Sequence, residues 1–95
     1  MRLTEYEVKS IKESFLNIFE EGTLSLFGSR VDDAKKGGDI DLFIQTPKEK
    51  ATLENKIKFL VMLKEKIGEQ KIDVVLSRDK TRLIEQEALK NGVEL

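Results

Sequence analysis

The sequence predicts a small α+β fold, with an α/β-like order of elements, in which a mixed β-sheet carries its helices mainly on one face. Three observations predict it. Apolar residues recur every three or four positions in three long segments. Three short segments between them are apolar or alternate apolar with polar residues, as strands do. The 95 residues suffice for one modest core and not for two, so we expect a single domain over residues 1–95.

The first helix is expected over Thr4–Glu20, where apolar residues line one face. They are Val8, Ile11, Phe15, Ile18 and Phe19. Thr4 and Glu7 have the spacing of a capping box, and Gly22 stands where a left-handed C-cap would fall. The apolar, β-favouring stretch Thr23–Phe27 then predicts a buried strand.

A short helical turn is expected over Ser29–Lys36, followed by a second strand over Asp39–Gln45 that Pro47 ends. A second helix is expected over Lys48–Ile67. Its predicted core face holds Leu53, Ile57, Leu60, Val61 and Ile67. Three further apolar residues, Phe59, Met62 and Leu63, exceed what one core face needs, and we expect them to form a surface for a partner.

The third strand is expected over Lys71–Ser77, because Ile72, Val74 and Leu76 alternate with other residues. A last helix is expected over Asp79–Asn91 and ends near Gly92. Helices therefore alternate with strands along the chain, which favours an α/β or α+β sheet.

Composition excludes several classes of function. The chain has no cysteine and no histidine, so it lacks the parts for Ser-His-Asp, Cys-His or cysteine–zinc chemistry. Seventeen basic residues against eighteen acidic ones give a net charge of −1, which argues against a dedicated nucleic-acid binder. The longest apolar run is Phe59–Leu63, far too short for a membrane span, and the N-terminus does not resemble a secretory signal. We expect a cytoplasmic protein.

Three aspartates carry the chemistry that remains. Asp39 and Asp41 are two apart in a predicted strand, so their side chains leave the same face about 7 Å apart. Asp73 has the same phase in another predicted strand. If the two strands are adjacent, the three acids lie together on the face opposite the helices. Carboxylates this close repel one another unless a cation lies between them, and hard oxygen ligands suit Mg²⁺.

The turn before these acids suits a phosphate. Gly28 allows a backbone to approach a ligand closely, and Ser29 offers a hydroxyl and a backbone amide. Arg30, with Lys35 and Lys36, could neutralise triphosphate charge, although a solvated loop explains these cations equally well. A phosphate-binding turn beside paired acids predicts metal-assisted phosphoryl or nucleotidyl transfer.

The stretch Phe27-Gly28-Ser29, nine residues, then Asp39-Ile40-Asp41-Leu42 resembles the signature of the DNA polymerase β-like nucleotidyltransferases. The whole chain is similar to their smallest members, the minimal nucleotidyltransferases. The resemblance implies two Mg²⁺ ions held by Asp39 and Asp41, with Asp73 on the ion that activates the attacking hydroxyl. It also implies that Gly28 and Ser29, with Arg30 beside them, bind the phosphates of a nucleoside triphosphate.

The resemblance further implies a partner, because this chain has no room for an acceptor-binding domain. Similar proteins are commonly paired with a HEPN-type ribonuclease toxin and act as its antitoxin by transferring AMP from ATP to a toxin tyrosine. We therefore expect a protein adenylyltransferase in a toxin–antitoxin pair, as a hetero-oligomer or a homodimer. Two alternatives stay open. The chain could neutralise the toxin by contact without catalysis, or it could modify a small molecule in a pocket completed by a dimer.

Overall fold

The computed structural model describes residues 2–32 and 38–95 of the chain. It contains α1 (Glu5–Ile18), β1 (Thr23–Phe27), a 3-10 helix η1 (Gly28–Val31), β2 (Ile40–Gln45), α2 (Leu53–Ile67), β3 (Ile72–Leu76), α3 (Leu83–Asn91) and β4 (Val93–Glu94). The expected order of helices and strands is confirmed. The two-residue strand β4 was not expected, since two residues are too few for any alternation to show.

The strands form one mixed sheet in the order β3-β2-β1-β4. β1 pairs with β2 and with β4 in antiparallel fashion, whereas β2 and β3 run parallel. A parallel pair needs a crossover connection, and α2 supplies it between β2 and β3. The mixed α+β fold class predicted from the sequence is therefore confirmed.

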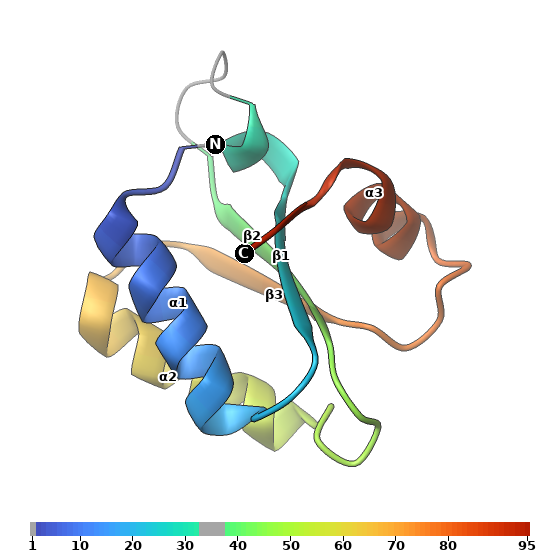
Figure 1. Ribbon diagram of the computed structural model, residues 1–95, viewed down its shortest axis with the longest axis horizontal. Coiled ribbons are helices and arrows are strands. Elements are labelled where there is room, and N and C mark those ends of the chain that lie inside the picture. Colours follow the sequence, from blue (N-terminus) through green and yellow to red (C-terminus); the bar gives the residue numbers. More distant parts are fainter. Residues whose placement is uncertain (1, 33–37) are drawn as a thin grey trace.

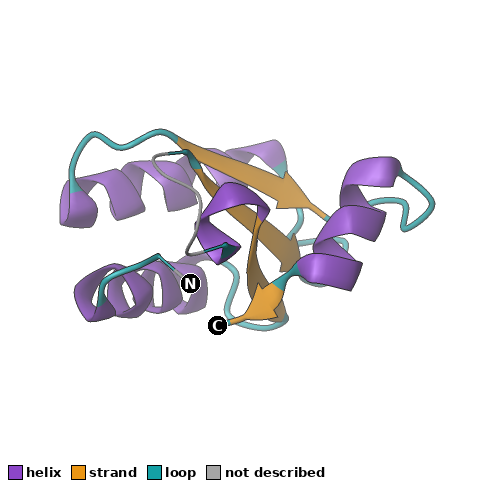
Figure 2. Ribbon diagram, turned by 90° about the horizontal axis from the view of Figure 1, so that it is seen from above, coloured by secondary structure: helices purple, strands orange, loops and turns teal. Residues whose placement is uncertain are grey.

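The main core lies between the sheet and the two long helices, α1 and α2, which cover one face together (Figure 1). The alternation in β2 decides which residues enter it: Ile40, Leu42 and Ile44 are fully buried there. α3 lies on the other face, and seen from above the sheet separates it from the helix pair (Figure 2). There Ala88 packs against Phe27 and Phe43 in a second, much smaller cluster.

The start of α1 is as predicted, but its end is not. Thr4 Oγ1 accepts a hydrogen bond from the Glu7 amide at 3.0 Å, and the Glu7 carboxylate accepts one from the Thr4 amide at 2.9 Å. The helix ends at Ile18, and Glu20 takes the left-handed conformation with φ 69°. Gly22 therefore does not cap it. A Cβ on Gly22 would overlap the Gln45 carbonyl, so this glycine permits close approach of the chain to the end of β2.

The two later helices begin further along the chain than expected. α2 begins at Leu53 because Thr52 caps it through the Asn55 amide at 3.1 Å, while residues 48–50 form a turn after Pro47. α3 begins at Leu83 instead of Asp79. The Asp79 carboxylate accepts hydrogen bonds from the Thr81 amide and hydroxyl, which closes a local turn ahead of the helix.

The expected core face of α2 is wrong in part: Leu60 and Ile67 pack against the core as expected, but the other three members are exposed. Phe59 and Leu63, assigned to a partner surface, are fully buried, whereas Ile57 and Val61 are 51% and 54% exposed. Leu53 is exposed as well. The helix carries two apolar stripes, and the sequence pattern cannot rank them. The stripe with Phe59 is the buried one because its ring packs against Phe19 of α1, with centroids 5.8 Å apart.

None of the helices that the structure describes is both long enough and apolar enough to span a bilayer.

Candidate active site

β2 and β3 place two of the three predicted acids side by side. The strands are adjacent and parallel, and their register pairs Asp41 with Asp73. Neighbouring strands lie about 4.8 Å apart, so the two side chains leave the same face at close range. Asp39 directly precedes β2, two residues before Asp41. The strand adjacency on which the sequence argument depended is therefore present, and all three acids lie on the face opposite α1 and α2.

Gly28 lies against one of these acids. Phe27 pairs with Asp41 across the sheet, which brings the next residue, Gly28, beside the Asp41 carboxylate. Gly28 has φ +77°, a conformation that other residues rarely adopt, and a Cβ there would overlap Asp41 Oδ2. The turn and the acid can be this close only because the residue is glycine.

Ser29 connects the same turn to the chain just before the acids. Gly38 has φ +94°, and a Cβ on it would overlap the Ser29 hydroxyl. The turn Gly28–Ser29 therefore contacts Asp41 at one residue and the backbone next to Asp39 at the other. The structure brings the predicted phosphate-binding residues and the predicted acids together.

Arg30 lies in the same turn, but its guanidinium is directed at protein acceptors. It donates to the Gly38 carbonyl from Nε at 3.2 Å, to the Arg2 carbonyl from Nη1 at 3.0 Å and to Gln70 Oε1 from Nη2 at 3.4 Å. Its expected role as a phosphate ligand stays a prediction. The other two loop cations that we considered, Lys35 and Lys36, lie outside the described residues.

The charges around Asp41 oppose its ionisation. Its partial burial raises the pKa of the carboxyl group, and repulsion from Asp73, Asp39 and Glu87 raises it further, against the attraction of Lys71. Lys71 instead pairs with Asp39 at 3.4 Å. Sequence reasoning missed both Glu87 and Lys71 as neighbours of the site. Lys71 follows the phase of Asp73 and could have been found, whereas Glu87 reaches the site only through the docking of α3.

Hard divalent cations bind carboxylate oxygens, so the donor chemistry of Asp39, Asp41 and Asp73 fits Mg²⁺. Burial raises the pKa of Asp41 most, and repulsion from Asp73 and Asp39 raises it further; a cation bound between the acids would offset that repulsion. Within residues 2–32 and 38–95, no three acidic side chains are already grouped closely enough to hold one ion together. Asp39 is paired with Lys71 at 3.4 Å.

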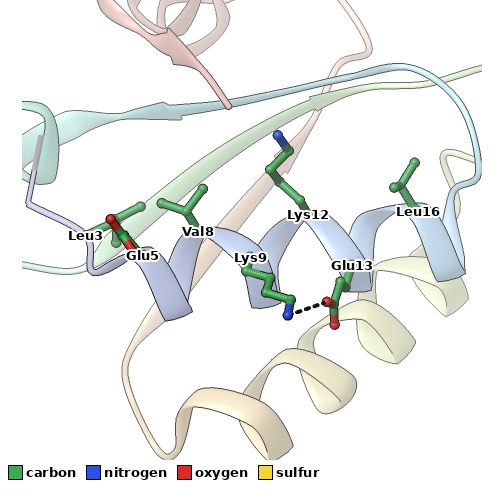
Figure 3. Close-up of a pocket in the computed structure, with 7 residues that line it drawn as sticks. All are labelled: Leu3, Glu5, Val8, Lys9, Lys12, Glu13 and Leu16. Atoms are coloured by element: carbon green, nitrogen blue, oxygen red, sulfur yellow. Dashed lines mark ion pairs between the residues drawn. The ribbon is translucent and has the colours of Figure 1, made fainter.

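A hollow of about 470 Å³ lies on α1, away from these acids. Figure 3 shows it, with Leu3, Val8 and Leu16 among charged residues. α1 covers the opposite face of the sheet. This hollow contains none of the predicted site residues, and we assign it no part in the chemistry.

Asp41 and Asp73 are thus paired carboxylates on adjacent strands, and they lie beside a turn that needs glycine. The family model described as polymerase beta, nucleotidyltransferase, matches residues 9–95. The chain therefore belongs to this family and is a nucleotidyltransferase. A comparison with curated proteins found no match.

Proposed function

We propose that the protein is a Mg²⁺-dependent enzyme that transfers a nucleoside monophosphate, AMP from ATP, to a hydroxyl group of a partner protein. One observation carries the proposal. Asp41 and Asp73 share a register on adjacent strands, and Gly28 lies directly against Asp41. This arrangement supports a site in which acids and a phosphate-binding turn act on the same triphosphate.

In the proposed reaction, the acceptor oxygen attacks the α-phosphorus of ATP while the bond from that phosphorus to the bridging oxygen breaks. Pyrophosphate leaves, and the proton of the hydroxyl passes to the Asp73 carboxylate. Gly28 and Ser29 hold the β- and γ-phosphates. Asp39 and Asp41 would hold two Mg²⁺ ions, with Asp73 on one of them, and the ions would stabilise the entering and leaving oxygens.

For the acceptor we propose a HEPN-type toxin, which makes this chain its antitoxin; this step rests on the family resemblance. A feature of α2 supports a protein partner. Ile57, Val61 and Met62, with Ile18 of α1, line a hollow of about 420 Å³. Half-exposed isoleucine and valine side chains in one place are typical of a surface that another protein covers.

The test is incubation with α-labelled ATP, Mg²⁺ and the product of the neighbouring gene. We expect label on the partner, and none with Asp39→Ala or without Mg²⁺. A partner that stays unlabelled under these conditions would contradict the proposed acceptor. A variant with all three aspartates replaced by alanine separates catalysis from contact: if it still neutralises the partner, the neutralisation does not depend on transfer.

A further inference from the structure

The guanidinium of Arg30 connects three parts of the chain that meet beside the acids. The distances to the carbonyls of Gly38 and Arg2 are 3.2 and 3.0 Å, and the distance to the Gln70 side chain is 3.4 Å. Gln70 in turn donates to Glu7 of α1 at 2.8 Å. The Arg30 side chain is partly buried in this network. Its guanidinium is planar and carries several N–H donors, so it can bond acceptors that lie in different directions.

Arg2 completes the network from the other side. Its amide donates to the Arg30 carbonyl at 2.7 Å, and its guanidinium donates to the carbonyls of Ser29 at 3.1 Å and Asp32 at 3.2 Å. The two arginines thus each donate to the backbone of the other. Ser29 and Arg30 have their carbonyls satisfied by Arg2, which fixes the orientation of the turn.

These contacts hold two segments at a defined separation. The turn Gly28–Ser29 stands on one side, and Gly38, directly before Asp39, stands on the other. Gly38 is so close to Ser29 that a side chain on it would overlap the Ser29 hydroxyl. The bond from Arg30 to the Gly38 carbonyl bridges this junction.

We propose that Arg30 is a positioning residue whose guanidinium, with Arg2, sets the phosphate-binding turn relative to Asp39 and Asp41. The inference rests on the nucleotide binding proposed above. Under this proposal Arg30 acts through backbone geometry and leaves the phosphates to Gly28 and Ser29.

The competing role is direct contact with phosphate, and the two roles predict different variants. A phosphate ligand works mainly through its charge, so lysine would replace Arg30 well, and alanine would weaken the salt dependence of binding. A positioning fork needs three donors in fixed directions, so lysine would be no better than alanine. The salt dependence would then stay as in the unmodified protein.

The experiment measures binding of fluorescent ATP with Mg²⁺ at several salt concentrations, with thermal melting to confirm that each variant is folded. We expect Arg30→Lys and Arg30→Ala to weaken binding equally, by about tenfold, the effect of a lost charge-assisted hydrogen bond. Arg2→Ala should weaken binding in the same direction, although it removes a different side chain. Lys48→Ala, an exposed cation outside the network, should bind as the unmodified protein does.

NMR of the Arg30 Nε–H supplies a readout that needs no nucleotide. We expect slow exchange of this proton in the free protein, and little change in its shift when nucleotide is added. An Arg30→Lys variant that keeps its affinity within about twofold, or a large shift on nucleotide addition, would overturn the proposal. If the unmodified protein binds no nucleotide, the proposed function fails. Hydrogen exchange of the Asp32 amide then tests whether Arg30 positions the turn. Faster exchange in both Arg30 variants supports this role, and unchanged exchange refutes it.

Discussion

The two faces of the sheet are built for different purposes. The face under α1 and α2 is apolar along all three long strands, and the central residues of β2 are completely buried there. The face under α3 has a small cluster around Phe27 and Phe43, and beside it Asp39, Asp41 and Asp73 are left partly or largely exposed. One short helix covers too little of this face to bury the acids. Most of the buried core is therefore on one face and the proposed active site is on the other, so the two faces should respond to different substitutions.

The largest effect is expected at Asp41, where function and stability should separate. Asp41→Asn removes a carboxylate at the centre of the site, and we expect activity to fall by about a thousandfold or more, or about 4 kcal/mol of transition-state stabilisation. Thermal stability should stay equal or rise, because the substitution removes a partly buried charge and its repulsion with Asp73 and Asp39, which together raise the pKa of Asp41. Rates of pyrophosphate release and melting temperatures test both. Glu49→Gln, an exposed acid in another part of the chain, is the control.

The opposite behaviour is expected at Phe59 on the apolar face. Phe59→Ala should reduce the free energy of unfolding by about 3–4 kcal/mol, because it removes a fully buried ring packed on Phe19. Nucleotide binding by the protein that remains folded should be unchanged. Ile57→Ala, on the exposed stripe of the same helix, should cost less than about 1 kcal/mol. Equal losses in urea unfolding would mean that α2 buries a different stripe.

The buried Glu85 carboxylate should make the free energy of unfolding depend on pH. Burial raises its pKa, but bonds from the amides of Asp79 and Arg78, from Ser77 and from Arg82 outweigh this and lower the pKa from 4.5 to about 2. The carboxylate therefore stabilises the fold by about 3 kcal/mol above pH 4.5, and this contribution is lost as the pH falls toward 2. Urea unfolding at pH 7, 4.5 and 2 should show Glu85→Gln less stable at neutral pH and equal to the unmodified protein near pH 2. A difference that stays constant across this range would contradict the assignment.

The last comparison is between two glycines with positive φ. Gly28 and Gly68 have φ +77° and +86°, but a Cβ on Gly68 would meet nothing within 4 Å, whereas one on Gly28 would overlap Asp41. Alanine at either position should cost about 1–2 kcal/mol through backbone strain. Only Gly28→Ala should also reduce activity, by about tenfold or more, since it displaces Asp41, a carboxylate of the proposed active site. Loss of activity in both variants would point to backbone strain as the cause.

The elements of the chemical face could be predicted well from the sequence. Alternation in 39–45 and 71–77 assigns Asp41 and Asp73 to the side away from the core, and the glycine and serine after the first strand mark the turn. These are local patterns, so they can be recognised in the sequence without knowledge of the tertiary structure. The choice between the two apolar stripes of α2 could not be predicted, because it depends on where Phe19 of α1 lies.

The remaining differences have the same physical origin. The contacts of Arg2 with Ser29 and Asp32 join residues 27 and 30 positions apart, and no spacing rule connects them. Glu87 affects Asp41 only because α3 docks on the second face. The last helix was expected to begin at Asp79, whose side chain closes a turn with Thr81 instead. Local signals predicted the elements, and the long-range packing determined how they meet.

The strand order places Asp73 on a strand at the edge of the sheet. β3 is an edge strand that pairs only with β2 among the described strands, whereas β2, which carries Asp41, has a strand on each side. Directly after β3, Ser77, Arg78 and Asp79 all donate to the Glu85 carboxylate. The Glu85 carboxylate therefore connects the C-terminal end of β3 to α3 through hydrogen bonds. Loss of these hydrogen bonds would let β3 move and would separate Asp73 from Asp39 and Asp41, while the rest of the sheet stays intact.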